Sequence, residues 1–208
     1  YNKNLYAICI IRDPRDTIVS FHGSLKNKYW TGLRYWCQFY KRYNNLQENR
    51  NILIFRYENL VDNPDEIQDI ITKHFPFLNK KINFSEYHKF AEPSIKSKLA
   101  LNGVREVSPT ISKWKNHLPR VKQQMLLHGD ISKSLITFGY EKNDSWISIL
   151  DDVENIKYES FWEEYFTKKD LFKRQLIGYK AVFNHFAYDN FGFDYKNLKR
   201  KIKNLWLK

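Results

Sequence analysis

A short apolar run, residues 5–11, passes directly into the segment Arg12-Asp13-Pro14-Arg15-Asp16, and this junction constrains the fold more than any other part of the chain. An isoleucine-rich run of this length is typical of a strand that is buried on both faces of a parallel sheet. Pro14 suits the first turn of a helix, because that position requires no backbone N–H. We therefore expect an α/β fold in which a buried strand leads into a helix.

The loop between this strand and this helix is expected to bind an anion. In open α/β sheets, ligands bind where the carboxyl end of a strand meets the N-terminus of the next helix. Arg12 adds a planar fork of donors there, and Ser20, expected on the helix more than one turn after Pro14, adds a hydroxyl. Two ordinary interpretations stay open. Arg12 could form an ion pair with Asp13 or Asp16, and the Ser20 hydroxyl could bond back to a helix carbonyl.

The spacing Arg12-Asp13-Pro14-x-Asp16-x-x-x-Ser20 resembles the R-[ND]-P-x-D-x-x-x-S motif with which sulfotransferases hold the 3′-phosphate of 3′-phosphoadenosine 5′-phosphosulfate (PAPS). Three further segments follow in the order that this family has. They are residues 52–60 followed by Asn63-Pro64, then Trp114-Lys115-Asn116-His117-Leu118, and finally Phe138-Gly139-Tyr140-Glu141. The resemblance covers roughly residues 5 to 141.

The resemblance implies a PAPS-dependent enzyme that transfers a sulfuryl group to a hydroxyl or amine of a small-molecule or glycan acceptor. PAPS is then the co-substrate, and no metal is required. The residues that the resemblance assigns to the nucleotide are Arg12, Ser20, Tyr57, Arg105, Lys113 and Trp114. By general frequencies, Trp114 also fits a hydrophobic core and Lys113 a solvated surface, while Tyr57 also fits a role in holding its loop.

The catalytic residues are not assigned, because the family's phosphate loop of the P-x-[ST]-G-[TS]-[TS] kind and its catalytic histidine or glutamate are not found before Arg12. We therefore interpret the chain as the C-terminal part of a longer sulfotransferase, and we expect it to be inactive alone. The six histidines show no metal-ligand spacing.

The expected architecture is a three-layer α/β domain with a P-loop-type parallel sheet, only partly present in this chain. Residues 1–141 are expected to form the C-terminal part of the sulfotransferase domain, and residues 142–208 an α-helical extension. The periodicity predicts one crossover helix that joins the two strands as a right-handed βαβ unit. The expected elements are strands at 5–11 and 52–56 and helices at 32–49, 64–75 and 120–138, the last with an interruption at Gly129 and an end at Gly139.

The chain carries a formal net charge of +12, which favours an anionic partner without choosing among nucleotide, nucleic acid, sulfated glycan and membrane surface. A nucleic-acid-binding module is one alternative, but no recognised motif is present and the basic residues are dispersed, so we expect no nucleic acid as partner. A P-loop kinase-like nucleotide phosphotransferase is another. It would require a metal-binding carboxylate at a strand end, whereas the strand ending at Phe55 leads into Arg56-Tyr57.

The basic C-terminal end, residues 196–208, has two interpretations. The ordinary one is a solvated terminus, and the other is contact with a membrane surface or a glycan through its lysines and Trp206. No segment approaches the roughly 18 apolar residues that a membrane span requires. The two cysteines give no disulfide framework, and a cytoplasmic location is expected.

Overall fold

The computed structural model describes residues 5–23, 25, 27–95, 104, 111–162 and 168–191. The chain divides into two compact units, residues 1–164 and 165–208. Arg105 and the basic end at 196–208 lie outside the described residues, so their predicted roles stay predictions. Among the described residues, no helix combines the length and the apolar character needed to cross a bilayer.

Two parallel strands, β1 (Ala7–Ile11) and β3 (Ile52–Arg56), form the sheet beside which the site is built. The predicted parallel pairing is confirmed, with Ile11 opposite Arg56 at the carboxyl ends. The expected burial of the first strand on both faces is wrong, because Ile8 and Ile10 are 44% and 49% exposed. In the described part of the chain β1 pairs only with β3, so no described strand pairs with its second edge.

The connection between the two strands differs from the single helix expected at 32–49. It contains α2 (Arg34–Tyr40) and α3 (Tyr43–Gln47), which are separated at Lys41 and Arg42. Phe39 and Tyr43 both contact Phe138, with ring centroids 6.1 and 4.6 Å away, respectively. Residues four positions apart lie on one helix face, so the predicted apolar face is kept across the break.

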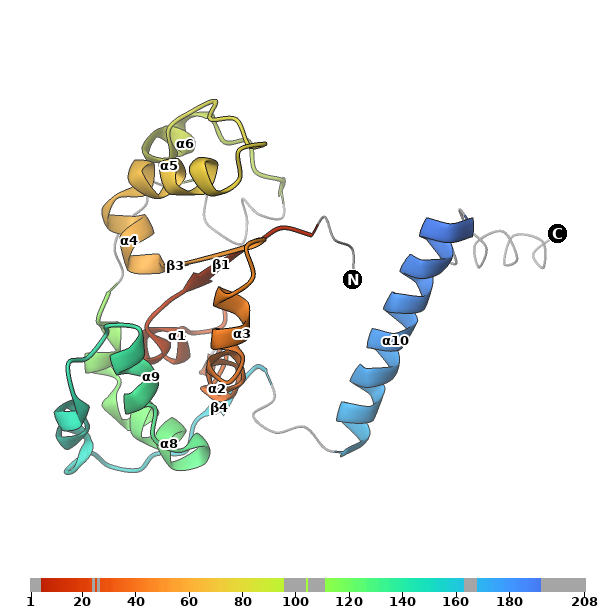
Figure 1. The fold of residues 1–208 in the computed structure, drawn as a ribbon. Helices are drawn as coiled ribbons and strands as arrows, with labels where there is room; N and C mark the ends of the chain where they lie inside the picture. Colours follow the sequence, from red (N-terminus) through yellow and green to blue (C-terminus); the bar gives the residue numbers. More distant parts are fainter. Residues whose placement is uncertain are drawn as a thin grey trace. The chain divides into compact units, whose positions relative to one another are not determined.

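Helices lie on both sides of this strand pair (Figure 1). On one side are α4 (Tyr57–Asp62), α5 (Pro64–His74), the short 3₁₀ helix η1 (Phe84–Glu86) and α6 (Tyr87–Phe90); on the other are α1 (Pro14–Ile18), α2 and α3. The predicted helix starting at Pro64 is confirmed. It buries Ile67, Ile71 and Phe75 against Phe55 of β3. The chain is thus a mixed α/β protein with small parallel sheets.

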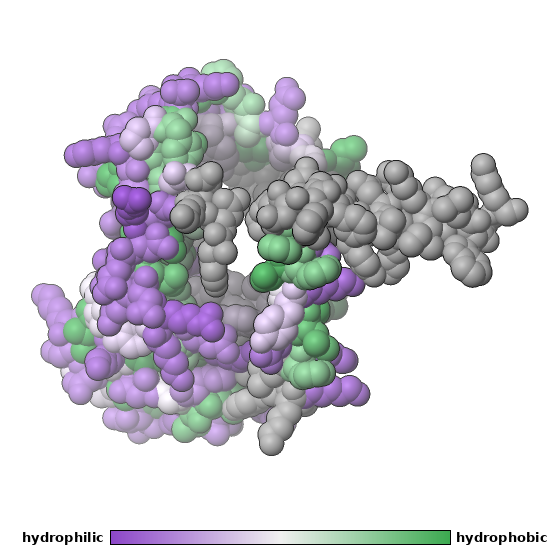
Figure 2. All heavy atoms as spheres, turned by 45° about the vertical axis from the view of Figure 1, so that its right-hand side comes forward, coloured by the Kyte–Doolittle hydropathy of each residue, from purple (hydrophilic) through white to green (hydrophobic). Residues whose placement is uncertain are grey.

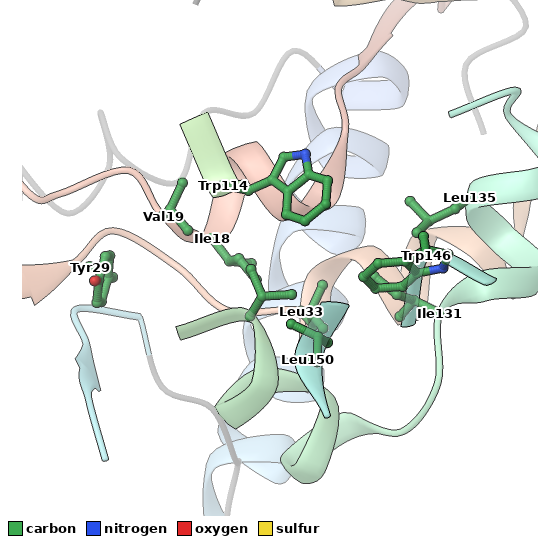
Figure 3. Packing of buried hydrophobic residues seen from close by; sticks show 10 residues of the cluster. Ile18, Val19, Tyr29, Leu33, Trp114, Ile131, Leu135, Trp146 and Leu150 are labelled. Atoms are coloured by element: carbon green, nitrogen blue, oxygen red, sulfur yellow. The ribbon is translucent and has the colours of Figure 1, made fainter. Parts of the chain in front are cut away.

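The larger core joins the segments after residue 110 to the first helix. These segments are η2 (Lys113–Asn116), α8 (Leu118–His128), α9 (Ser132–Thr137) and η3 (Asp144–Leu150). Ile18, Leu33, Trp114, Leu135 and Trp146 are among the buried residues that meet there (Figure 3). The predicted interruption and end are confirmed, because Gly129 and Gly139 take positive φ angles of 89° and 69°.

A second parallel pair lies at the edge of the first unit, formed by β2 (Lys28–Tyr29) and β4 (Glu159–Ser160). Residues 144–160 belong to the first unit, and Trp146 and Leu150 are part of its core. The second unit contains α10 (Lys168–Phe191), a helix of 24 residues. On the face shown in Figure 2, polar residues cover much of the described surface and hydrophobic residues form patches between them.

Candidate anion-binding site

The loop after β1 is held by a helix cap. The Asp13 side chain accepts a hydrogen bond from the backbone N–H of Arg15 at 2.9 Å, and Pro14 occupies the first turn of α1, as predicted. The Asp13 N–H in turn donates to Oε1 of Glu58 at 3.1 Å. The path of the loop is therefore fixed at Asp13, through both its side chain and its backbone N–H.

Arg12 and Tyr57, two of the predicted site residues, lie together at the carboxyl ends of the paired strands. The guanidinium carbon of Arg12 stands 4.7 Å from the centroid of the Tyr57 ring, a cation–π distance. This contact follows from the strand register. Ile11 pairs with Arg56, so the residues that follow them, Arg12 and Tyr57, emerge side by side. A cavity of about 240 Å³ adjoins Arg12, with Thr17 among its other lining residues.

Ser20 is not on the helix, and this part of the prediction is wrong. α1 ends at Ile18, and the chain turns out of the helix to pair with β2, where Trp30 donates its N–H to the Ser20 carbonyl at 2.7 Å. The Ser20 hydroxyl donates to the Asp16 carbonyl at 3.2 Å, which is the ordinary interpretation raised for it above.

Asp16 joins Ser20 to the segment around Trp114. Its buried carboxylate accepts the backbone N–H of Ser112 at 2.7 Å and that of Trp114 at 3.0 Å. Trp114 itself is 4% exposed and belongs to the core. Lys113 is exposed on η2. The Trp114 segment is thus joined to α1 by hydrogen bonds to the Asp16 carboxylate, and not by Lys113.

Arg15 is almost fully buried, and its guanidinium is the positive charge around which the carboxylates of the site are arranged. It forms a two-pronged ion pair with Asp13, with contacts of 3.0 and 2.7 Å, and its Nη1 lies 2.5 Å from Oε1 of Glu141. Its guanidinium carbon also lies 4.1 and 4.7 Å from the ring centroids of Trp114 and Trp146. Burial disfavours the charged form, but hydrogen bonds and charge from Asp13 and Glu141 outweigh it and raise the pKa of Arg15.

Glu58, in the first turn of α4, which directly follows β3, contacts the loop after β1. Besides the hydrogen bond from the Asp13 N–H, it accepts a hydrogen bond from the Tyr140 hydroxyl at 3.1 Å, and Arg56 Nε lies 3.7 Å from the same Oε2 atom. Burial and the negative charge of Glu58 together raise the pKa of Tyr140 well above its usual value. The Tyr140 hydroxyl is therefore a fixed donor in the neutral form.

These contacts join the four motif segments of the sequence at one place. Asp13 bonds Glu58, Glu58 bonds Tyr140, Arg15 bonds Glu141 and Asp16 bonds Trp114, across separations of 45, 82, 126 and 98 residues. Sequence reasoning assigned no site role to Arg15, Asp16, Glu58, Tyr140 or Glu141. The sequence did contain a signal for these five residues, because each of them lies inside one of the four motif segments.

A polar cavity of about 340 Å³ opens beside the junction of these segments. Arg56 and Lys115 contribute positive charge to its lining, and Glu58 and Glu141 contribute negative charge. Across the described residues, no three histidine, cysteine or acidic side chains are grouped as a metal site would require.

Comparison with protein-family models, with curated proteins and with solved structures gives no match.

Proposed function

We propose that this chain holds the nucleotide of PAPS in a sulfotransferase. One observation carries the proposal: the four segments that resemble the family lie far apart in the sequence and are joined by hydrogen bonds around Asp13 and Arg15. The convergence supports interpreting the segments as one functional unit, because a chance set of short matches has no reason to meet in space.

Two of the proposed binding residues, Arg12 and Tyr57, directly follow the carboxyl ends of β1 and β3. Arg12 would grip the 3′-phosphate through its guanidinium fork, and the Ser20 hydroxyl would give up its bond to a carbonyl to donate to the same group. The Tyr57 ring contacts the Arg12 guanidinium and would give the adenine side of the site an aromatic face. Asp16 keeps the Trp114 segment, and with it Lys113, against the loop.

The proposed reaction is in-line transfer of the sulfuryl group to an acceptor hydroxyl or amine, which leaves adenosine 3′,5′-bisphosphate. Positioning and charge stabilisation would dominate such a step, as in phosphoryl transfer. The residues of this chain would bind and orient the nucleotide. The proposal includes a three-layer α/β domain with a P-loop-type sheet, of which β1, β3 and their flanking helices are a part, and a cytoplasmic location.

The phosphotransferase alternative gains no support from the carboxylate nearest the end of β3. Glu58 follows that strand by two residues, but its two oxygens accept hydrogen bonds from the Asp13 backbone N–H and from the Tyr140 hydroxyl. Its lone pairs are therefore engaged in holding the fold, whereas a metal-binding carboxylate would direct them toward a nucleotide-bound ion.

Calorimetry with two nucleotides tests the proposal. Adenosine 3′,5′-bisphosphate should bind more tightly than adenosine 5′-phosphate, and Arg12→Ala should weaken only the first, by about 1.5–3 kcal/mol, the range for a hydrogen bond to a charged group. Arg42→Ala is the matched control, because Arg42 is exposed at the α2–α3 break. Equal losses for the two nucleotides would contradict the assignment of Arg12.

Single-stranded oligonucleotides separate the nucleic-acid alternative from the proposed one. Binding to nucleic acid of any sequence should weaken steeply with added salt. Oligonucleotide binding that is tighter than that of the bisphosphate, at every sequence tried, would overturn the proposed function.

A further inference from the structure

The long helix of the second unit, α10, exposes many large apolar side chains. It runs without interruption from Lys168 to Phe191 (Figure 1). Seven of its apolar side chains are between 50% and 69% exposed, namely Phe172, Leu176, Ile177, Tyr179, Val182, Phe183 and Phe186. Single exposed apolar residues are ordinary on a protein surface, but a contiguous set of them marks a surface that binds something.

Six of these seven side chains share one side of α10. At 3.6 residues per turn they fall within an arc of about 120°, and Ile177 lies on the opposite side of the helix. Five of the six follow one another at intervals of four and three residues, which keeps them in a nearly straight line. We call these five the apolar stripe: Phe172, Leu176, Tyr179, Phe183 and Phe186.

Exposed lysines border the apolar stripe along one edge. Helical geometry places Lys169, Lys173 and Lys180 beside the stripe and within about 40° of one another around the helix axis. A lysine side chain can lay its methylene groups on an apolar surface while its ammonium group reaches water or a negative charge. This side of α10 therefore combines apolar side chains with a row of positive charge.

The composition of the second unit extends this positive charge. Residues 165–208 contain eleven lysine and arginine residues and three acidic ones, so they carry eight of the twelve net positive charges of the chain. The first unit balances most of its basic residues with acidic ones. An excess of charge that extends over the whole unit favours a broad negative surface over a short acidic segment of a partner protein.

A second copy of α10 does not suit this side of the helix. Intervals of four and three residues are those of a coiled coil, in which Lys173 and Lys180 would flank the apolar seam. In an antiparallel pair, the edge that carries these lysines would face the same edge of the other copy. In a parallel pair they would face positions 168 and 175, which hold lysine and glutamine. Neither arrangement gives the lysines a carboxylate.

Nucleic acid would satisfy the lysines but not the apolar stripe. Proteins that bind single strands stack bases on aromatic rings within a positively charged groove. The apolar stripe lies on the convex surface of a helix and includes the aliphatic side chain of Leu176. It therefore offers neither a groove nor an unbroken series of stacking rings.

We infer that α10 binds the surface of an anionic phospholipid bilayer and lies in the plane of the interface. Interfacial helices carry aromatic and aliphatic side chains on one side, which enter the boundary between headgroups and acyl chains, and basic side chains that meet anionic headgroups. The apolar stripe would occupy that boundary along about 21 Å of helix. The bordering lysines would stay at the level of the headgroups. This inference goes beyond the proposed function and does not rest on it.

Co-sedimentation of the 208-residue chain with vesicles tests the inference. One set of vesicles contains phosphatidylcholine and phosphatidylserine in a three-to-one ratio, and the other contains phosphatidylcholine alone. The chain should bind the mixed vesicles at least tenfold more tightly than the neutral ones. This preference should shrink at high salt, because salt screens the attraction between lysines and headgroups.

Uncharged substitutions separate the apolar stripe from the rest of α10. Phe183→Ser should weaken binding to the mixed vesicles fivefold or more, because it removes an aromatic ring from the acyl boundary. Ile177→Ser is the matched control and should change the affinity less than twofold, since Ile177 is as exposed as Phe183 but lies on the opposite side of the same helix. The double variant Lys173→Ser, Lys180→Ser should reduce the preference for mixed over neutral vesicles.

Four outcomes would overturn the inference. The chain does not bind the mixed vesicles, the two serine variants lose equal affinity, or Phe183→Ser binds as wild type does, which would leave the contact to the basic end at 196–208. The fourth is that Phe183→Ser keeps vesicle binding but loses a dimer in ultracentrifugation, stability of the first unit, or binding to oligothymidylate. Circular dichroism with vesicles measures the helix content of each variant, and where serine lowers it, Leu176→Ala and Ile177→Ala replace the pair.

Discussion

Replacing Arg15 by methionine should destabilise the first unit strongly. Methionine keeps a long unbranched side chain, but it removes the two-pronged ion pair with Asp13 and the contact with Glu141. The Asp13 side chain is 9% exposed, so its carboxylate would remain buried without a cation. The Glu141 side chain is 25% exposed and can turn toward water.

The magnitude follows from the burial of the two carboxylates. Removing one partner of a buried ion pair costs about 3–5 kcal/mol, because the remaining charge is uncompensated. We assign most of this loss to Asp13, since Glu141 can be solvated. Arg15→Lys should cost about 1–3 kcal/mol, because lysine keeps the charge but loses the planar fork and part of the stacking on Trp114 and Trp146.

Denaturant unfolding followed by tryptophan fluorescence measures these losses, since Trp114 and Trp146 lie against the guanidinium. Arg42→Met is the control and should stay within about 0.5 kcal/mol of wild type, as surface substitutions do. In the background of Arg15→Met, Asp13→Asn should recover about 1 kcal/mol or more, because asparagine still caps α1 but carries no charge. A loss below about 1 kcal/mol in Arg15→Met, or no recovery in the double variant, would refute the reasoning.

Three further changes have defined outcomes. Asp16→Asn should destabilise the chain by about 1–3 kcal/mol in the same unfolding assay, because each oxygen of this buried carboxylate accepts one backbone N–H and asparagine replaces one of them by an NH2 group that can only donate; a neutral result would show that these bonds are dispensable. Ser20→Ala should cost about 0.5–1.5 kcal/mol of affinity for adenosine 3′,5′-bisphosphate in calorimetry, as expected for a neutral donor, and no loss would remove Ser20 from the site. The raised pKa of Tyr140 keeps it protonated in the native state while the unfolded chain ionises above about pH 10, so its contribution to stability is full below pH 10 and falls as the pH rises further. Guanidinium unfolding at pH 9 and pH 11.5 should therefore show wild type losing stability relative to Tyr140→Phe, and a constant difference would contradict the assigned shift.

The sequence was sufficient to predict the βαβ core and the helix limits that carry strong local signals. Pro14 and Pro64 mark helix starts and Gly139 a helix end, because proline and glycine restrict or extend the backbone in ways that neighbours rarely override. The two strands were recognisable by their runs of apolar β-branched residues. The end of α1 was not predictable, because it is set by pairing of Ser20 with Trp30, a contact that helical periodicity does not contain.

The side-chain contacts within the site could be predicted only in part. Arg12 and Tyr57 were named, and their contact follows from the strand register. An ion pair of Arg12 with Asp13 or Asp16 was the alternative left open, but the structure pairs Asp13 with Arg15, whose side chain lies back over the N-cap of its own helix. Such a choice between two neighbouring arginines depends on side-chain direction, which spacing along the sequence does not specify.

The bonds that join Asp13 and Arg15 to the rest of the site also set the order in which this chain can fold during synthesis. Arg15 bonds Glu141, a residue 126 positions later, so the loop after β1 cannot reach its final form until the ribosome has released residue 141. Until then Arg15 and its apolar neighbours stay unpacked and accessible to chaperones and to other nascent proteins. The loop that carries Asp13 and Arg15 is therefore among the last parts of the first unit to be completed.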